Sequence, residues 1–368
     1  MKLWSKSIPT IFNSLGAKSI ISKTTENLRT DIRAMSTQIP TTQKAIRIHE
    51  TGGLEVLRYE DIPVPEIQDH EVLIKNKYAG INFIESYFRT GLYPSQKPYT
   101  LGREAVGVIV SKGSKVQDFD VGDYISYLSA STFAQYTKFD PSIRAFKLPK
   151  ESTDEKLKQY AALPVQGFTA LTFINESYNV QKGDYILVHA AAGGVGLILT
   201  QLIKARGAHV IATASSDEKL KLAKENGAEF LINSKTEDIV KKVLEYTNGK
   251  GVASSFDGVG KDTFQISLDS LARKGTLVSF GNASGAVEPV PLTKLTPKNL
   301  KLLRPTLFNY IVEKEEWEFY SNQLRELVES GELNLRIEKT YPLSNYSQAA
   351  EDLEGRKTTG KLFLEIPQ

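Results

Sequence analysis

The chain has 368 residues, of which 40% are hydrophobic and 24% are charged, the balance of an ordinary globular protein of two or three domains. It contains no cysteine, which excludes disulfides, a thiol nucleophile and any cysteine-ligated zinc or iron–sulfur site. The net charge of +3 comes from residues 1–34, where six basic residues stand against two acids, so residues 35–368 carry one net negative charge. That body has no general basic excess for binding nucleic acid or anionic lipid.

Residues 1–34 are basic and rich in serine and threonine, with no acid before Glu26. Several apolar residues fall near one helical face, the pattern of a mitochondrial presequence: Leu3, Trp4, Ile8, Ile11, Phe12 and Leu15. The alternative is a disordered extension ahead of Met35, which could start a shorter cytosolic form. Both interpretations stand, so we expect a cytoplasmic protein with a mitochondrial form through residues 1–34.

The first part of the body is predicted to be β-rich. Short apolar runs separated by glycine and proline indicate strands at 44–50, 56–65, 71–81, 105–113 and 124–128. Residues 156–174 then have a helical pattern that we expect to be broken at Pro164 and Gly167. We expect a compact β-rich domain followed by this interrupted helix.

From Tyr185 the pattern changes to alternating strands and helices. Strands are expected at 185–190, 209–214, 229–233, 252–257 and 276–281, with helices at 193–207, 216–227 and 238–249. Ser215 and Glu218 predict a capping box at the start of the second helix, and Asn226–Gly227 predicts its end. This alternation predicts an α/β fold with a doubly wound parallel sheet. A long amphipathic helix at 315–331 and a strand at 361–367 follow.

The run 185–203 is apolar and long enough to resemble a membrane span. Gly193, Gly194 and Gly196 lie at its centre, however, and a buried strand, a glycine turn and a helix explain it better. We therefore expect no transmembrane helix.

Small residues between a strand and a helix let the backbone approach a pyrophosphate, which the free N–H groups of the helix then bind. A tight turn without a ligand is the alternative, but the position favours a dinucleotide.

The end of the second strand indicates which dinucleotide. A carboxylate there would bind a free ribose and repel a 2′-phosphate. The strand instead ends at Ala214, Ser215 and Ser216, with Lys219 one turn later. Neutral hydroxyls and a cation suit a phosphate, so NADPH is favoured over NADH. A solvated helix lysine is the alternative for Lys219.

Several motifs resemble one family. The segments are Gly183-Asp184, Ala191–Gly196, Gly80–Glu85, Gly91–Pro94, Phe280–Gly285, Leu303–Pro305 and Gly360–Leu362, together with Leu187, Gln201, Lys204 and Arg89. Together they look like the zeta-crystallin type of quinone oxidoreductase, a zinc-free branch of the medium-chain dehydrogenase/reductase superfamily. The resemblance covers about residues 44–368 and is strongest to fungal homologues. It implies a GroES-like catalytic domain at 40–164 plus 306–368, around a Rossmann NADPH-binding domain at 165–305.

The resemblance also implies roles for single residues. On the cofactor side these are Thr169, Gly193, Gly194, Val195, Gly196, Ser215, Lys219, Phe280, Asn282 and Arg356. Asn82, Tyr87 and Tyr93 would line the substrate side as the catalytic set. Ser234 stands where the family often has a phosphate-binding tyrosine. The sheet edge after Thr276 would form a homodimer contact.

Zinc-containing relatives carry a Gly-His-Glu stretch, and Gly102-Arg103-Glu104 stands there instead. We therefore expect no metal site and a substrate that needs only hydrogen-bond help, since hydride transfer to a quinone gives a delocalised anion. Tyr87 or Asn82 could donate to that anion. An alkenal or enone double-bond reductase with the same hydride chemistry is one alternative. The resemblance to the zeta-crystallin type implies another, an AU-rich RNA-binding protein that uses the same cleft. We expect His49 and His70 on the surface and His189 buried as a satisfied core histidine.

Overall fold

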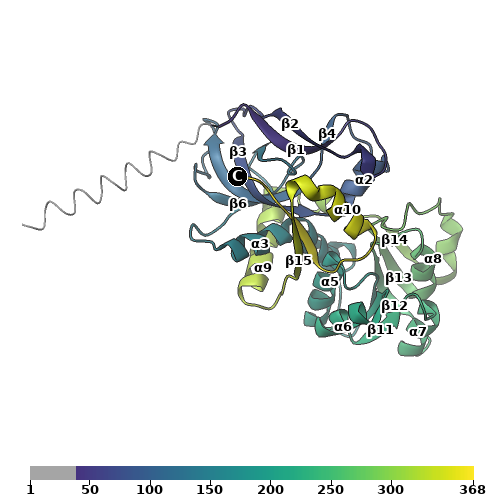
Figure 1. Ribbon diagram of the computed structural model, residues 1–368. Coiled ribbons are helices and arrows are strands. Elements are labelled where there is room, and N and C mark those ends of the chain that lie inside the picture. The colour runs from purple at the N-terminus through teal and green to yellow at the C-terminus, as the bar shows by residue number, and fades with distance from the viewer. Residues whose placement is uncertain (1–38) are drawn as a thin grey trace, which may run out of the picture. The chain divides into compact units, whose positions relative to one another are not determined.

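Figure 1 shows the computed structural model of the chain, which describes residues 39–368. The predicted leader, residues 1–34, lies outside the described residues. Residues 42–368 form one unit, to which the following account applies. Within residues 39–368, no helix combines the length and apolarity that crossing a bilayer requires.

One sheet has six parallel strands, the five that the alternating pattern predicts and a sixth, Lys301–Leu303, that it did not predict. They are β9 (Tyr185–Val188), β10 (His209–Ala214), β11 (Phe230–Asn233), β12 (Val252–Asp257), β13 (Leu271–Ser279) and β14 (Lys301–Leu303). Their order across the sheet is β11-β10-β9-β12-β13-β14, and every neighbouring pair is parallel. The order therefore reverses beside β9, which is the switch point at which doubly wound folds bind ligands. The predicted Rossmann sheet is confirmed.

Helices cover both faces of this sheet (Figure 1). They are α5 (Gly194–Ala205), α6 (Asp217–Glu225), α7 (Ile239–Tyr246) and α8 (Phe264–Ser270). Alternation along β9 explains the two layers. Ile186 and Val188 join the core that includes α5, whereas Leu187 points to the opposite core with α7 and α8. Because both faces are buried, the strand is apolar throughout.

The predicted start of α6 is wrong by one residue. Ser216, not Ser215, is the N-cap, and its hydroxyl accepts a hydrogen bond from the backbone N–H of Lys219 at 3.4 Å. The helix therefore begins at Asp217. This shift leaves Ser215 outside the cap, at the carboxyl end of β10. The predicted end is confirmed, with Asn226 as C-cap and Gly227 at φ +108°.

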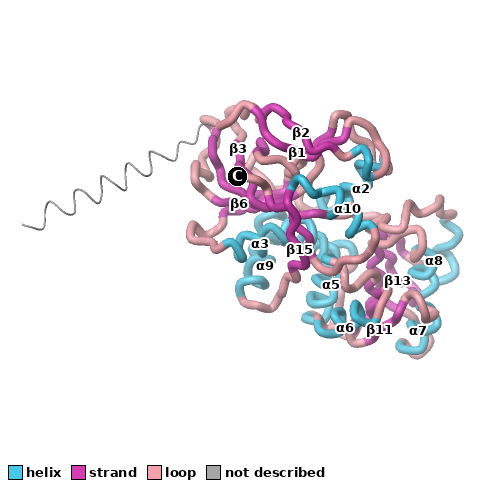
Figure 2. The backbone as a smooth tube through the Cα atoms, in the orientation of Figure 1, coloured by secondary structure: helices cyan, strands magenta, loops and turns pink. Residues whose placement is uncertain are grey.

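The β-rich part contains two sheets (Figure 2). The larger has the order β15-β16-β3-β5-β6-β8, with β7 (Tyr136–Phe139) pairing with β3. Its strands are β3 (Val72–Ile81), β5 (Glu104–Lys112), β6 (Tyr124–Leu128), β8 (Ala145–Lys147), β15 (Ile337–Pro342) and β16 (Lys361–Glu365). The smaller has the order β2-β1-β4, with β1 (Thr42–Ile48), β2 (Arg58–Pro63) and β4 (Tyr99–Thr100). Both sheets pack on a shared core with α2 (Ile84–Thr90) and α10 (Tyr346–Glu354) nearby.

The helical connection after this part is not broken as predicted. Helix α3 (Asp154–Ala162) continues through the π-helical turn Leu163–Gly167 into α4 (Phe168–Thr172) and a second π-helical turn, Phe173–Ser177. Pro164 is tolerated because it stands in the first positions of a π-turn, where its missing N–H costs little. Helix α9 (Lys314–Glu329) covers α4, with Trp317 stacked on Phe168 at 4.4 Å between ring centroids.

Four short 3₁₀ turns complete the description: Leu54–Val56, Leu292–Lys298, Leu307–Asn309 and Leu343–Asn345. The larger sheet draws on strands from both ends of the chain, because β15 and β16 join β3 and β5. The β-rich part is therefore discontinuous in sequence. The exact domain boundaries at 164–165 and 305–306 stay a prediction.

Candidate active-site cleft

A cleft of about 530 Å³ runs along the carboxyl ends of β9, β10 and β12 and continues to the β-rich part. Its size is typical of a ligand site. At one end lie the glycine loop after β9 and residues following β10 and β11. At the other end lie the end of β3, helix α2 and the start of β5. The segment between α10 and β16 also lines it.

The glycine loop has the geometry of a phosphate cradle. Gly193 is the N-cap of α5, so the first N–H groups of the helix have no helical partner and face the loop. Ala190 enters the loop at φ +50°. A Cβ on Gly196 would lie 2.4 Å from the carbonyl oxygen of Ala190, so only glycine permits this approach of helix and strand. A Cβ on Gly193 would meet only that same oxygen, at 3.2 Å.

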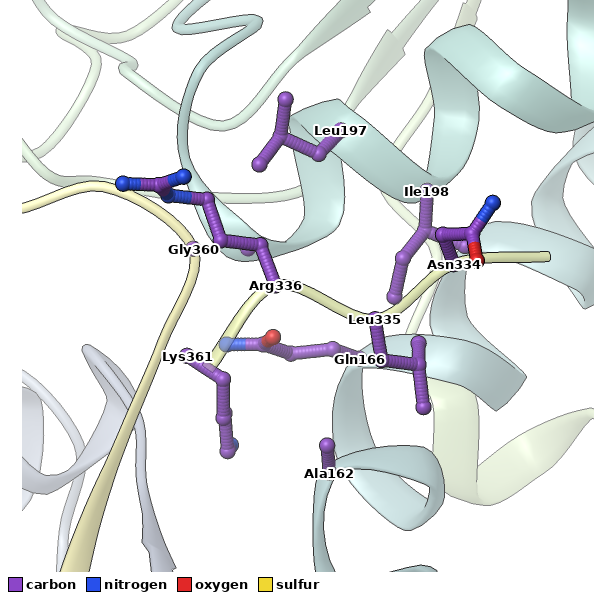
Figure 3. Close-up of a pocket in the computed structure, with 10 residues that line it drawn as sticks. Ala162, Gln166, Leu197, Ile198, Asn334, Leu335, Arg336, Gly360 and Lys361 are labelled. Atoms are coloured by element: carbon purple, nitrogen blue, oxygen red, sulfur yellow. The ribbon is translucent and has the colours of Figure 1, made fainter. Parts of the chain in front are cut away.

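Residues behind the loop hold it in place. Gln166 packs so closely on Gly194 that a Cβ there would lie 2.1 Å from the Gln166 side-chain oxygen. Gly360, just before β16, donates its backbone N–H to the carbonyl of Ala192 at 3.1 Å. Figure 3 shows Gln166, Gly360 and Lys361 around a cavity of about 10 Å³ behind the loop, room for one water at most. The chain between α10 and β16 therefore supports the loop.

Three cations converge at the far end of the cleft. Lys219, Lys235 and Arg356 all line it, beside Ser215. Burial lowers the pKa of Lys219, and the neighbouring charges of Lys235 and Arg356 lower it further. The Lys219 ammonium donates to the backbone carbonyl of Arg356 at 2.6 Å, and Arg356 reaches Asp262 only at 3.7 Å. An anion between these cations would relieve their repulsion, as a 2′-phosphate would.

The middle of the cleft offers an aromatic wall and a free hydroxyl. Phe280 packs edge-on against Phe173, with 5.3 Å between ring centroids, and both line the cleft with Thr169. Thr169 is 8% exposed, and its hydroxyl has no hydrogen-bond partner among residues 39–368. The Asn282 side chain lies elsewhere. With its amide oxygen directed to Arg304 at 2.8 Å and its nitrogen to Gly281 at 3.0 Å, it does not line the cleft.

Two tyrosines form the substrate end. The Tyr87 and Tyr93 rings meet edge-on, 5.2 Å apart. The Tyr87 hydroxyl accepts a hydrogen bond from the backbone N–H of Asn282 at 2.8 Å, which links α2 to the loop after β13. Burial raises the pKa of Tyr87 to about 12. Tyr87 is therefore a neutral phenol at neutral pH, and its own proton can be donated into the cleft. The Tyr93 hydroxyl accepts from Arg304 at 3.2 Å.

Asn82 lies on the cleft wall, but its amide is already bonded. Its nitrogen donates to Glu104 at 2.8 Å and to the Gly80 carbonyl at 3.3 Å, and its oxygen accepts from Lys361 at 2.9 Å. Lys361 and Glu104 form a direct ion pair in which both side chains are fully buried. Burial lowers the pKa of Lys361, and Glu104 opposes that shift. Both amide hydrogens of Asn82 are thus engaged, which leaves Tyr87 as the better donor.

His189 is buried as predicted, at 3% exposure. One ring nitrogen contacts the Thr213 hydroxyl at 3.2 Å and the other the Ser267 hydroxyl at 3.0 Å. Ser267 in turn donates to Asp257 at 3.0 Å. Burial lowers the pKa of His189, so a neutral ring joins the ends of β9, β10 and α8. His49 and His70 are exposed, which confirms both predictions.

The structure brings together every predicted site residue except the side chain of Asn282. Among the lining residues to which sequence reasoning gave no site role are Arg103, Gln166, Lys235 and Gly360. Lys235 follows Ser234 directly, so a search for cations beside that position would have found it. Gln166 carried no local signal, and Gly360 was marked only as part of a family motif, because only the folded chain places the two residues against the glycine loop.

The cleft fits a nicotinamide dinucleotide phosphate from end to end. The Gly196 approach to Ala190 opens the loop to a diphosphate, and the cation cluster suits a 2′-phosphate. The unpartnered Thr169 hydroxyl suits the amide of a nicotinamide ring. Across residues 39–368, no three histidine, aspartate or glutamate side chains are grouped so that they could hold a metal ion.

Comparison with known proteins agrees with this geometry. Residues 68–148 match the alcohol dehydrogenase GroES-like domain, and residues 194–325 match a family described as zinc-binding dehydrogenase. A probable quinone oxidoreductase of Schizosaccharomyces pombe is 44% identical over 321 residues, covering 87% of this chain and 96% of that protein. A 2-haloacrylate reductase of Burkholderia is 33% identical over 328 residues, with 87% and 98% covered.

One solved structure is of particular use, the quinone oxidoreductase of Escherichia coli in complex with NADPH. It is 38% identical to this chain and superimposes with a TM-score of 0.83, covering 88% of this chain and 99% of that one. The likeness therefore extends over both the parallel sheet and the β-rich part.

Proposed function

This chain belongs to the quinone oxidoreductase family, and we propose that it transfers a hydride from NADPH to quinones. The observation that carries this proposal is the single cleft that joins a diphosphate loop and a cluster of three cations to a substrate end built from Tyr87 and Tyr93. The bound cofactor supplies the hydride. A quinone accepts this hydride together with one proton and becomes the hydroquinone, while the oxidised cofactor, NADP⁺, is left.

The residues of the chain then have distinct tasks. The N-terminus of α5 and the loop Gly193–Gly196 bind the diphosphate. Lys219, Lys235, Arg356 and Ser215 bind the 2′-phosphate, and Thr169 orients the ring beside Phe280. Tyr87 donates its hydrogen bond to the oxygen on which negative charge develops, because its own oxygen is already held by the Asn282 N–H.

A second candidate activity is the reduction of an activated carbon–carbon double bond. It uses the same hydride and the same donor, and the 2-haloacrylate reductase is a relative over most of both chains. The RNA-binding alternative rests on the family resemblance alone, and the single net negative charge of residues 35–368 counts against it.

The test is steady-state oxidation of NADPH at 340 nm, a wavelength at which the reduced cofactor absorbs, with a quinone series and an alkenal series. We expect kcat/KM to be highest with quinones. Turnover of alkenals alone would transfer the proposal to the second activity, and turnover of neither series would reject both. Tyr87→Phe removes the donor to the substrate oxygen and also the acceptor for the Asn282 N–H. We expect it to lower kcat with little change in the binding of NADPH, because Tyr87 lies at the substrate end of the cleft.

We also propose a homodimer that forms through the β14 edge of the parallel sheet. Within residues 39–368, strand β14 pairs only with β13, so its other edge has backbone groups that a second strand can pair with. The turn Leu292–Lys298 just before it buries none of its residues, and Leu292 is 79% exposed. For residues 1–34 the proposal from the sequence is unchanged: a cytoplasmic protein with a mitochondrial form.

A further inference from the structure

One cation at the substrate end has no task in the proposed reaction. Arg103 lines the cleft beside Asn82, Phe83, Ile84, Tyr87 and Tyr93. The other charged residues that line it, Lys219, Lys235, Asp262 and Arg356, lie at the phosphate end or its mouth. Among the residues that the structure describes, Arg103 is therefore the one charged side chain facing the place where a substrate would bind.

Most hydrogen-bond donors of Arg103 are unused. A guanidinium has five N–H donors. One NH₂ group donates to the Tyr99 hydroxyl, and the buried Nε has no partner within residues 39–368. The arginines that do pair with carboxylates there are Arg47, Arg89, Arg336 and Arg356. Arg103 thus brings a positive charge and free donors to the cleft without a bound carboxylate.

The side chain is held in a fixed direction. Its guanidinium carbon lies 4.2 Å from the centroid of the Phe88 ring and 5.8 Å from that of Tyr99. Phe88 in turn meets Tyr93 edge-on at 5.8 Å. Stacking leaves the planar edge of the guanidinium free to meet a carboxylate with two parallel hydrogen bonds. Phe88 therefore joins the ring of Tyr93, which lines the cleft, to the guanidinium of Arg103.

The backbone on both sides of Arg103 is fixed by buried groups. Gly102 has φ +102°, and a Cβ there would lie 2.5 Å from the backbone nitrogen of Phe133. The Gly102 N–H donates to the fully buried carboxyl of Glu85 at 2.9 Å. Glu104, the next residue, is held by Lys361. A solvated surface arginine would not need two buried carboxyl groups to fix its neighbours.

Glu85 does not neutralise Arg103 by direct contact, since the two form no ion pair. Burial raises the pKa of Glu85 to about 7, with Arg103 opposing that shift. A substantial share of Glu85 is therefore protonated at neutral pH, and the positive charge of Arg103 is only partly balanced. An anion in the cleft would neutralise the remaining positive charge and accept hydrogen bonds from the free donors of Arg103.

We propose that Arg103 makes the substrate end an anion subsite, so that the preferred acceptors are quinones carrying a carboxylate or sulfonate group. This inference rests on the proposed quinone reduction and narrows its substrate class. The chemistry of the step is unchanged: the ring gains the hydride and one proton, and the acidic group stays ionised against Arg103. The anion contributes binding energy and fixes the orientation of the ring against Tyr87 and Tyr93.

The first test measures binding alone. Protein saturated with NADP⁺, so that the phosphate subsites are filled, is titrated calorimetrically with 2-naphthoate and with the neutral 2-naphthamide. We expect the acid to bind at least about tenfold more tightly, the range of one charge-assisted pair. Arg103→Met should remove that difference, whereas Arg103→Lys should keep part of it.

Arg144→Met is the matched control. Arg144 also stacks on an aromatic ring, Phe308, at 5.5 Å, and its buried Nε also has no partner in the described part of the chain. It does not line the cleft, so its loss should leave both affinities unchanged. Melting temperatures of all variants show whether each one folds. An acid bound no better than the amide by the wild type, or equally well by Arg103→Met, overturns the subsite.

The second test separates this inference from the proposed function. The wild type and Arg103→Met are compared with 1,2-naphthoquinone-4-sulfonate and 1,2-naphthoquinone. We expect Arg103→Met to raise KM for the sulfonate at least about tenfold and to leave the neutral quinone nearly unchanged. Equal losses with both quinones overturn the anion subsite while quinone reduction stands. No turnover of either quinone by the wild type, with naphthoate still bound through Arg103, supports the subsite and rejects quinone reduction.

Discussion

Lys235 and Arg356 stand close enough to Lys219 that each lowers its pKa and so raises the cost of charging it. Such clustering of like charges is unfavourable in the empty protein and favourable once a dianion lies between the three residues. The repulsion among these three cations therefore indicates a binding site for an anion. Ser234 stands where the family often has a phosphate-binding tyrosine. The next residue, Lys235, lines the cleft and brings a cation to that place instead.

We predict that Lys219→Ala weakens the binding of NADPH about tenfold and changes the binding of NADH less than about twofold, since only NADPH carries the 2′-phosphate. Fluorescence titration of each reduced cofactor measures both values. Lys221→Ala is the control, because Lys221 is exposed on the same helix and does not line the cleft. Equal weakening of NADPH and NADH would remove Lys219 from the phosphate subsite.

Glu85 gives the protein a pH dependence that can be measured. Burial raises its pKa from 4.5 to about 7. The folded state therefore binds a proton more tightly than the unfolded state, and stability falls as pH rises through this range and levels off above about 7. Glu85→Gln removes that cost, because a neutral amide does not ionise.

We expect Glu85→Gln to gain roughly 2–3 kcal/mol in unfolding free energy relative to wild type between about pH 5 and about pH 8. Urea unfolding at the two pH values measures it. Glu155→Gln is the control, since Glu155 is also in the first turn of a helix but is exposed. Parallel pH profiles for wild type and Glu85→Gln would show that Glu85 titrates normally.

Among the elements, α2 shows how seven residues serve two purposes. Glu85 and Arg89 are four apart, so both face inward, where Glu85 accepts from Gly102 and Arg89 pairs with Glu354 at 2.6 Å. Tyr87 between them faces the cleft instead. The buried side chains of Glu85 and Arg89 thus hold the helix that carries Tyr87. The segment from Arg356 to Lys361 likewise holds the cofactor end of the cleft in place. Arg356 accepts from Lys219, Gly360 donates to the glycine loop, and Lys361 donates to Asn82.

Two glycines of the loop after β9 allow the packing role of the loop to be measured apart from its role in binding the cofactor. In Gly196→Ala the new Cβ would meet backbone atoms 2.4 Å and 2.8 Å away, which cannot give way as a side chain can. We expect this variant to lose about 1–3 kcal/mol of stability and most of its affinity for NADPH. Gly193→Ala meets a single atom at 3.2 Å and should melt near the wild-type temperature while still binding NADPH more weakly. Thermal unfolding and fluorescence titration measure the two effects, and a Gly196→Ala protein as stable as wild type would contradict the packing argument.

At the scale of the whole molecule, two sheets of different construction supply the two ends of one cleft. The parallel sheet provides a switch point where helix N-termini gather, and the β-rich part provides aromatic side chains and Arg103. Neither part contains the complete site. The Tyr87 contact with the Asn282 N–H at 2.8 Å joins the two directly.

The proposed dimer is tested at this same scale. Leu292→Asp places a charge on a side chain that is 79% exposed and should leave the fold intact while weakening association. Sedimentation equilibrium is expected to show a dimer for wild type and a lower average mass for the variant. Val121→Asp is the control, because Val121 is 59% exposed but far in sequence from β14. A wild type that sediments as a monomer would refute the β14 interface.

The sequence by itself determined the fold class and most of the cofactor site. Strand–glycine–helix alternation is a local signal, and a doubly wound sheet then places the loop after β9 and the residues after β10 at one edge. Local sequence signals gave wrong predictions at two places, the N-cap of α6 and the helix through Pro164. The cap of α6 is Ser216 and not Ser215. The helix continues through Pro164 as a π-helical turn, and the helix that follows packs under α9 through Phe168 and Trp317.

Only the tertiary structure decided which side chains are free to act. Asn82 and Asn282 carry the same amide, yet one is bonded to Glu104 and Lys361 and the other turns toward Arg304. Arg103 stands where zinc-containing relatives have a histidine and received no role from the sequence, yet it lines the substrate end of the cleft with unused donors. The physical reason is that hydrogen-bond partners come from strands hundreds of residues apart, such as β3 and β16, and sequence spacing carries no record of those contacts.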